Sequence, residues 1–166
     1  GVSVGAYDFA KDALGDLGME MAFWQVSMKP GKPLAFGTIQ GKPVFGLPGN
    51  PVSSMISFEE FVRPSLLKMM GHRQVFRPVV EALLQEEIRK TTGRRHFIRA
   101  FISFREGSYF ATTTGDQGSG ILMSMLKANG LIMIPEDQEI ARVGDKVKVQ
   151  LIDTVRSSEG VEKMQV

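Results

Sequence analysis

The sequence predicts two units of different class, an α/β unit followed by a small β-barrel. Helix and strand patterns alternate over residues 1–71, which is typical of α/β domains. After Gly71 the pattern changes to short segments that alternate with period two and are separated by Gly-rich turns, which indicates antiparallel strands. We therefore expect domains at residues 1–72 and 75–152, and an irregular tail at residues 153–166.

The elements of the first unit follow from local patterns. "YDFAKDALGDLG" has the spacing of an amphipathic helix that ends at Gly18, and "MAFWQV" indicates a short strand. "LAFGTIQ" and "KPVFGLP" are two further strand candidates, joined by a turn at Gly41–Lys42. "GNPVSSMISFEEFVRPSLLKMMG" predicts a helix that is capped by Asn50 and begins at Pro51. Pro64 lies inside this helix and should kink or break it.

The strands of the second unit are expected in "RHFIRAFISF", "SYFATTT", "GLIMIP" and "DKVKVQLI". The turns between them contain "EGS", "GDQGSGI" and "VGD". "VVEALLQEEIRK" is ambiguous between a helix and a strand, and we interpret it as a strand that joins the barrel. Together these segments predict a small antiparallel sheet or barrel.

Composition excludes several kinds of site and partner. The chain has 166 residues, of which 43% are apolar and 23% charged, as in ordinary globular proteins. It has no cysteine and only two histidines, His72 and His96, so thiolate sites and histidine-rich metal sites are excluded. The net charge of +2 is too small to indicate nucleic acid, and the basic cluster from Arg89 to Arg99 lacks interleaved stacking aromatics.

The chain shows no apolar run long enough for a membrane span and no recognisable signal peptide. We therefore expect a cytoplasmic protein without a membrane partner. The opening residues "GVSVG" read as a Gly-rich turn with no strand before it, so we expect a piece cut inside a domain.

Four stretches carry groups that suit an anion. In "SMKPGKPLAFG", prolines and a glycine hold Lys29 and Lys32 in a stiff loop; the alternative is a solvated basic turn. "GLPGNPVSS" leads into a helix start that favours phosphate; the alternative is an ordinary capped helix. "GVSVGAYDFAK" places Asp8 where it either caps a helix or positions a hydroxyl or metal-bound water. Arg99 lies within an apolar strand pattern and needs a partner there, such as a cross-strand salt bridge.

Four motifs together resemble the molybdopterin molybdenumtransferase family, the molybdenum insertases represented in animals by the gephyrin E domain. The motifs are "GVSVG" with "YD", "KPGKPLAFG", "GLPGNPVSS", and "TTTGDQGSG" followed by "SM". They occur in the family's order and span roughly residues 1–152. The resemblance implies that residues 1–72 are the second half of a three-layer α/β molybdopterin-binding domain, and that residues 75–152 are the small C-terminal β-barrel domain. It also implies that the acidic residues that hold magnesium lie outside this chain, so no metal ligand is expected within it.

The resemblance implies a reaction and a set of roles. Molybdate is inserted into adenylylated molybdopterin, AMP is released, and magnesium serves as a cofactor. The catalytic residues would be Lys32, Asp8 and Arg99. The molybdate-binding residues would be Lys29, Lys32, Pro33, Arg99 and Ser124. The residues near the nucleotide and pterin would be Ser3, Gly49, Asn50, Pro51, Ser53 and Ser119. A molybdate that touches both the lysine loop and the barrel residues would bridge the two domains.

The resemblance further implies a homodimer, and we expect this chain alone to be inactive. Two positions depart from the family pattern: Asp116 stands where histidine is usual, and Ala6 stands where an acid is common. Two rival functions are a scaffold of the gephyrin E-domain type, and an α/β domain that only adenylylates or carries the pterin. The complete oxyanion set of Lys32, Arg99 and Ser124 argues against the scaffold, and the barrel argues against the second rival.

Overall fold

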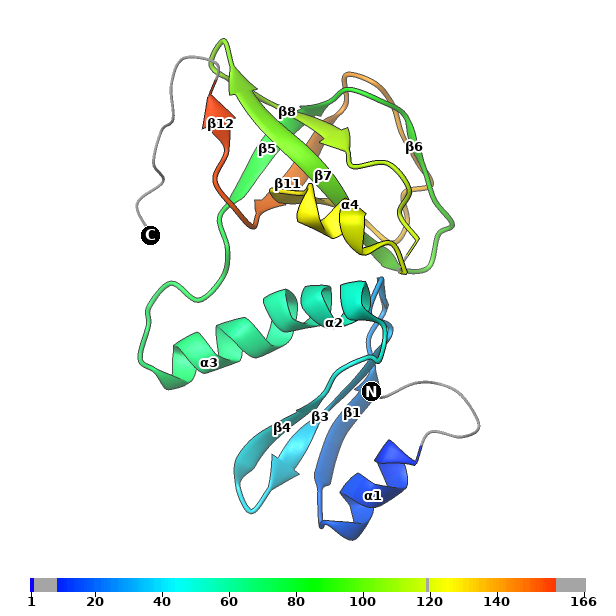
Figure 1. The fold of residues 1–166 in the computed structure, drawn as a ribbon, viewed down its shortest axis with the longest axis vertical. Helices are drawn as coiled ribbons and strands as arrows, with labels where there is room; N and C mark the ends of the chain where they lie inside the picture. The colour runs from blue at the N-terminus through cyan, green and yellow to red at the C-terminus, as the bar shows by residue number, and fades with distance from the viewer. Residues whose placement is uncertain (2–8, 119, 158–166) are drawn as a thin grey trace. The chain divides into compact units, whose positions relative to one another are not determined.

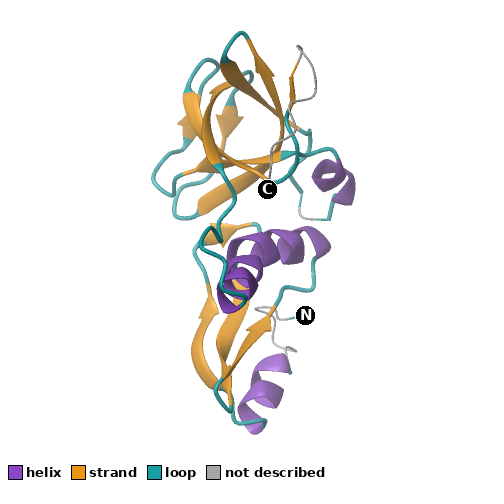
Figure 2. Cartoon of the chain, turned by 90° about the vertical axis from the view of Figure 1, so that its left-hand side faces the viewer, coloured by secondary structure: helices purple, strands orange, loops and turns teal. Residues whose placement is uncertain are grey.

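The computed structural model describes residue 1, residues 9–118 and residues 120–157 (Figure 1). The chain divides into two compact units, with the boundary between Phe76 and Arg77. The first unit combines helices with a sheet, and the strands of the second unit wrap into a barrel (Figure 2). This confirms the predicted order of an α/β unit followed by a small barrel. None of the helices in the described ranges is long and apolar enough to cross a membrane.

The first unit is built around a three-stranded antiparallel sheet in the order β1-β3-β4. Its elements are α1 (Ala10–Asp16), β1 (Glu20–Gln25), β2 (Met28–Lys29), β3 (Pro33–Ile39), β4 (Lys42–Gly46), α2 (Pro51–Ser57), the π-helical segment η1 (Phe58–Val62) and α3 (Arg63–Met69).

The turn of the β3–β4 hairpin is one residue earlier than the sequence pattern indicated. Ile39 pairs with Lys42, so the two turn residues are Gln40 and Gly41. Both have positive φ, 50° and 75°, as a two-residue hairpin turn of the kind that matches strand twist requires. The hairpin was therefore predicted correctly, but its turn lies at Gln40–Gly41 instead of Gly41–Lys42.

An aromatic row fixes the long helix to the sheet. The ring of Phe61 in η1 lies 6.5 Å from that of Phe23 in β1, and Phe23 lies 5.5 Å from Phe36 in β3. Trp24 is the next residue of β1, and the centre of its ring lies 5.8 Å from the ammonium of Lys11 in α1. The long helix and α1 thus contact neighbouring residues of β1. Helices that contact a sheet agree with the α/β class predicted from the sequence.

The long helix begins as the sequence predicts. Asn50 has an extended backbone, and its side-chain oxygen accepts from the Ser53 N–H at 3.3 Å. Pro51 occupies the first turn, where its missing N–H costs nothing. At the other end Gly71 has φ 84°, and the N–H of His72 bonds the carbonyl of Leu67 at 3.0 Å, as in a Schellman cap.

Pro64 does not break this helix. Helical residues continue on both sides of it, as η1 and then α3. The irregularity appears instead as the π-helical segment before the proline, where the Arg63 N–H bonds the carbonyl of Phe58. Pro64 cannot donate to a preceding carbonyl, and a local shift to wider hydrogen bonding accommodates that loss. Of the predicted kink or break, the break was wrong for this reason, and a local irregularity is found instead.

The second unit is a closed barrel of the strands β7, β8, β5, β11 and β9, in that order, with β9 pairing back to β7. Its elements are β5 (Val79–Leu84), β6 (Ile88–Arg89), β7 (Arg95–Arg105), β8 (Ser108–Thr113), α4 (Leu122–Leu126), β9 (Gly130–Ile134), β10 (Ile140–Ala141), β11 (Lys146–Leu151) and β12 (Arg156–Ser157). The long β7 allows closure, because its first half pairs with β9 and its second half with β8.

Alternate residues of the barrel strands fill the interior. On β7 the inward side chains are Ile98, Ala100 and Ile102, all at most 6% exposed. They pack with Ile132 of β9 and Val149 of β11 in one apolar cluster. The ambiguous segment "VVEALLQEEIRK" forms β5 and β6, which confirms its interpretation as strand.

Four short elements were not predicted. These are β2, α4, β10 and β12. The strand β12 lies in the region interpreted as an irregular tail, where Arg156 and Ser157 pair in parallel with Ser103 and Phe104 of β7. A two-residue strand depends on its neighbour for pairing, so its own sequence carries little signal.

Candidate oxyanion site

The predicted lysine loop is held at both of its ends. The Val26 N–H bonds the Lys32 carbonyl at 3.0 Å, and the Met28 N–H bonds the Val26 carbonyl at 2.9 Å. Pro30 and Gly31 between the two lysines are buried. The loop is therefore fixed, as the two prolines and the glycine predict.

Gly31 packs directly against the long helix. A Cβ atom on Gly31 would lie 2.7 Å from the Ser57 hydroxyl of α2, and closer still to the methyl group of Met28. Its φ is +99°, which side chains rarely adopt. In the structure this glycine serves both a left-handed backbone turn and a close approach of the helix.

Lys29 and Lys32 flank this contact and are both exposed. Among the described residues neither ammonium forms an ion pair. A fixed loop with two such groups can neutralise a doubly charged oxyanion, because each ammonium offers three donors.

The start of the long helix offers fewer free donors than its sequence suggests. Pro51 has no N–H, and Ser53 gives its N–H to Asn50. The N–H of Ser54 bonds the Asn50 carbonyl at 2.9 Å, and the Ser54 hydroxyl donates to the carbonyl of Pro48. The capped-helix alternative thus accounts for these groups of the first turn.

Arg99 is the centre of a second polar cluster, on the outer side of β7. The residue is 1% exposed, and its Nε and Nη2 atoms both donate to the Ser124 hydroxyl, at 3.0 and 2.9 Å. Its Nη1 donates to the Gln117 carbonyl at 3.1 Å, and Nη2 to the Gly118 carbonyl at 3.0 Å. The structure therefore brings together Arg99 and Ser124, two of the residues predicted to bind molybdate.

No cross-strand salt bridge of Arg99 is found in the part of the chain that the structure describes, so that alternative does not explain its burial. Main-chain carbonyls and one hydroxyl take its place. Burial lowers the pKa of the Arg99 guanidinium from its ordinary value, and the negative charge of Asp116 opposes this by raising it.

Gln117 is a member of this cluster that the sequence did not single out. Its side-chain oxygen accepts from the Arg99 N–H at 2.9 Å, and its side-chain nitrogen donates to the Arg99 carbonyl at 3.1 Å. Thr114 bonds the same carbonyl through its N–H at 3.0 Å, and its hydroxyl donates to the Ser124 carbonyl at 2.7 Å. A glutamine inside a Gly-rich turn was the only local sign of this role.

Other predicted site residues are not tested by the structure. Ser3, Asp8 and Ser119 lie outside the described residues, as does Ala6. Pro33 begins β3 and is half-buried, while Gly49 is exposed next to the helix cap. The described residues contain no group of three or more His, Asp and Glu side chains placed to hold a metal ion.

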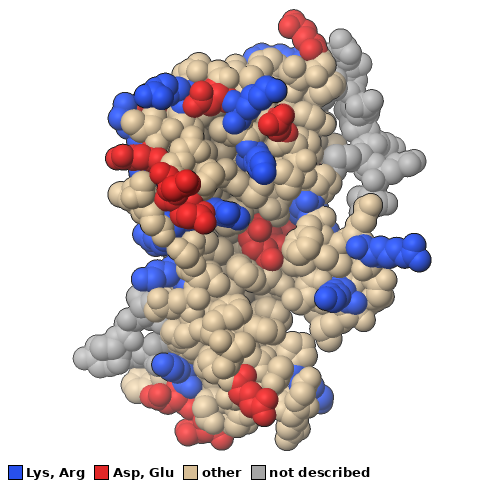
Figure 3. All heavy atoms as spheres, turned by 180° about the vertical axis from the view of Figure 1, so that it is seen from behind, with Lys and Arg blue, Asp and Glu red and all other residues tan. Residues whose placement is uncertain are grey.

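Charge over the rest of the surface is mixed. On the face drawn in Figure 3, basic and acidic side chains are interspersed. Several of them pair, such as Arg89 with Glu87 at 2.7 Å and Arg95 with Glu136 at 3.4 Å. The exposed lysines of the loop differ from these, because no acidic partner of theirs is found among the described residues.

Two protein families match the two units of the chain. Residues 1–68 match the family described as a probable molybdopterin binding domain, and residues 81–152 match the MoeA C-terminal region (domain IV). The chain is 39% identical over 156 residues to molybdopterin molybdenumtransferase 2 of Mycobacterium tuberculosis, with 90% of this chain covered. Both units of the chain are thus similar to parts of molybdopterin molybdenumtransferases. This confirms the resemblance drawn from the four motifs.

Further relatives in this family show the same extent of similarity. The molybdopterin molybdenumtransferase of Haemophilus influenzae is 35% identical over 152 residues, which is 90% of this chain and 37% of that protein. The chain spans 38% of the length of the Mycobacterium tuberculosis relative.

Solved structures agree with both the fold and the family. A molybdopterin biosynthesis moeA protein from Pyrococcus horikoshii has a TM-score of 0.66 and 31% identity, over 91% of this chain and 41% of that chain. A molybdenum cofactor biosynthesis protein from Pyrococcus furiosus has a TM-score of 0.66 and 26% identity, over 90% of this chain and 56% of that chain.

Proposed function

We propose that the protein to which this chain belongs inserts molybdate into adenylylated molybdopterin and releases AMP, as a molybdopterin molybdotransferase of molybdenum cofactor biosynthesis. One observation carries the proposal: a loop of this family's sequence is pinned to a helix by Gly31 and carries two exposed lysines without acidic partners among the described residues. Such a loop suits a tetrahedral dianion.

The lysine loop supplies charge and position. Lys29 and Lys32 neutralise molybdate, and Pro33 keeps the chain after Lys32 stiff. A fixed site of this kind lowers the barrier by holding molybdate near the reacting sulfurs of the pterin. It also stabilises charge on oxygen atoms as they leave. No protein nucleophile is needed, which suits a chain without cysteine.

The barrel contributes Arg99 and Ser124 to oxyanion binding, and Asp8 acts at the nucleotide end. The pterin and its nucleotide contact residues of the first unit and of the Gly-rich turn: Ser3, Gly49, Asn50, Pro51, Ser53 and Ser119. Magnesium belongs to the proposal as a cofactor, but we assign no step to it, because the described residues provide no cluster of ligands. We further propose a cytoplasmic homodimer.

The test compares Lys32→Ala with Lys42→Ala, which replaces another exposed lysine, at the start of β4. Hydrogen bonds to charged groups are worth about 1.5–3 kcal/mol, so Lys32→Ala should weaken molybdate binding by about 10- to 100-fold. Equilibrium dialysis with the full-length gene product measures this, beside the affinity for molybdopterin. Lys42→Ala should match the wild type in both. An equal loss of molybdate and pterin affinity in Lys32→Ala would place the lysine elsewhere.

A further inference from the structure

Gln117 and Arg99 hold one another reciprocally. The side-chain amide of Gln117 accepts from the Arg99 N–H at 2.9 Å and donates to the Arg99 carbonyl at 3.1 Å. The main-chain carbonyl of Gln117 in turn accepts from Nη1 of the Arg99 side chain at 3.1 Å. One residue therefore fixes both the backbone and the guanidinium of a buried arginine.

This set of hydrogen bonds between Gln117 and Arg99, called the clamp below, lies where the regular pairing of β7 with β8 ends. The last pairing between β7 and β8 joins Ala100 to Thr113. At the next residue, the Arg99 carbonyl still accepts from the Thr114 N–H of the neighbouring chain segment. The Arg99 N–H, however, donates to the side-chain oxygen of Gln117. Without that amide, a buried N–H group would lack its partner, which is costly in a strand.

The clamp also sets the shape of the Gly-rich turn. Gln117 Nε2 donates to the Gly115 carbonyl at 2.9 Å, and the Gly118 N–H donates to the Asp116 side chain at 2.7 Å. The carbonyls of Gln117 and Gly118 consequently point at the guanidinium. The direction of Arg99 and the path of the turn thus depend on the same amide.

We propose that Gln117 is a positioning residue for the oxyanion site and acts through Arg99. This rests on the proposed function, in which Arg99 contributes to the binding of molybdate, a doubly charged tetrahedral oxyanion. Gln117 does not itself touch the oxyanion. It keeps the guanidinium of Arg99 in one position, so that the positive charge of Arg99 is already in place when the oxyanion binds.

Gln117→Ala in the full-length gene product tests this, with Gln138→Ala as the matched control. Gln138 is also half-buried and also donates to a main-chain carbonyl, that of Ile140 at 3.1 Å. The dissociation constant and the KM for molybdate should rise about tenfold in Gln117→Ala, while the affinity for molybdopterin stays unchanged. Gln138→Ala should match the wild type. A purely structural role would lower the melting temperature and the active fraction, but would leave the KM for molybdate as it is.

Gln117→Glu keeps the proposal testable if the alanine variant folds poorly. A protonated carboxyl has one donor and one acceptor and can replace the amide, whereas a carboxylate loses the donor and faces the Arg99 carbonyl at close range. The ordinary pKa of a glutamate side chain is about 4.3, so the carboxylate predominates at neutral pH, and the KM for molybdate of Gln117→Glu should exceed that of the wild type there.

The outcomes separate this inference from the function on which it rests. If the wild type binds no molybdate, both are wrong. If the wild type binds molybdate, and both variants bind it with unchanged affinity, only the positioning role of Gln117 is wrong. A raised KM for molybdate in Gln117→Ala or in Gln117→Glu supports it.

Discussion

At Gly31 two requirements coincide that only glycine meets. The backbone has φ +99°, and the Ser57 hydroxyl of the long helix lies where a Cβ atom would reach it at 2.7 Å. The first requirement concerns local conformation, and the second concerns packing between a loop and a helix. Because Lys29 and Lys32 flank this residue, the contact also fixes the position of the two charges.

Gly31→Ala separates these requirements when it is compared with Gly41→Ala. Gly41 has φ +75°, but a Cβ atom there would meet open space. In Gly41→Ala the free energy of unfolding should therefore fall only by the cost of a left-handed backbone at a residue with a side chain, about 1–2 kcal/mol. In Gly31→Ala the free energy of unfolding should fall by about 1–3 kcal/mol more, because the added methyl group overpacks the contact with the helix. Urea unfolding of both variants measures the difference, and equal losses would show that the helix yields to the added methyl group.

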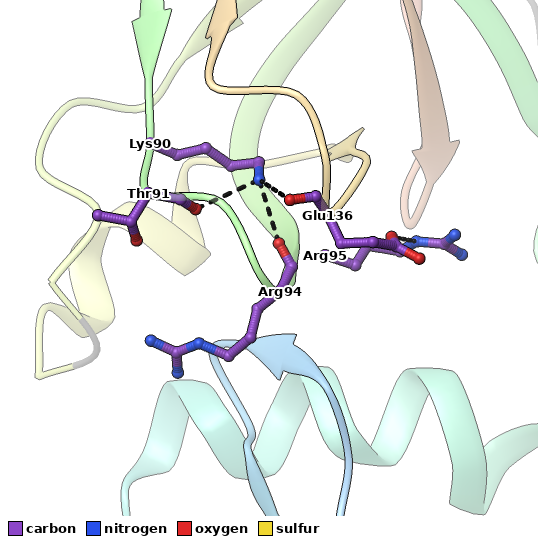
Figure 4. Close-up of polar contacts among 5 residues, drawn as sticks. All are labelled: Lys90, Thr91, Arg94, Arg95 and Glu136. Carbon is purple, nitrogen blue, oxygen red and sulfur yellow. Dashed lines mark hydrogen bonds and ion pairs between the residues drawn. The ribbon is translucent and has the colours of Figure 1, made fainter.

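At the scale of elements, a single buried lysine ties together two loops at one end of the barrel. Lys90 is 8% exposed, and its ammonium donates to the carbonyls of Thr91, Arg94 and Glu136 at 3.3, 3.2 and 3.3 Å (Figure 4). The short β6–β10 ladder and the bond from the Gly93 N–H to the Glu136 carbonyl, at 2.8 Å, join the same two segments. Three carbonyls thus share one cation.

Lys90→Met should destabilise the barrel, because the thioether fills similar space but leaves the carbonyls without their donor. Hydrogen bonds that involve a charged group suggest a loss of about 2–4 kcal/mol in the free energy of unfolding. Lys146→Met is the control, since its 3.8 Å pair with Glu81 is exposed and should contribute less than about 1 kcal/mol. Hydrogen exchange of the β9 amides reports the stability of the barrel alone. A loss no larger than that of Lys146→Met would mean that water replaces the ammonium.

At the scale of the whole molecule, the two units differ in how they are stabilised. The barrel has no open edge between β7 and β9, and residues such as Ile102, Ile132 and Val149 are fully buried. In the first unit, α1 has no buried residue, and Phe9 and Leu17 beside it are 74% and 67% exposed. The apolar face that the sequence predicts for this helix is therefore largely exposed, and of its leucines only Leu14 is half-buried.

Hydrogen exchange on the intact chain should follow this difference. The amides of Ile102, Ile132 and Val149 should exchange only through opening of the barrel, because these residues are buried inside it. The amides of α1 should exchange many times faster, because a helix of this length gains little stability without a buried face. Mass spectrometry of peptides from both regions measures the two rates. Similar rates would show that the chain opens as one cooperative unit.

The sequence by itself determined the features that depend on near neighbours in the chain. Asn50 and Pro51 start the long helix, Gly71 ends it, and the period-two pattern of residues 95–105 gives β7. The order of the two units and the family also follow from motifs that are continuous in sequence. Each of these signals needs only the preferences of adjacent residues.

Only the tertiary structure decided which groups meet across long stretches of chain. Arg99 finds Gln117 and Ser124, 18 and 25 residues away, and Lys90 finds Glu136, 46 residues away. The sequence predicted that Arg99 needs a partner, but not that main-chain carbonyls would accept most of the hydrogen bonds of its guanidinium. Every residue carries a carbonyl, so composition and spacing give no sign of which ones will surround a buried cation. Their directions are set by how the strands and turns fold together, and that is where the sequence ceases to be informative.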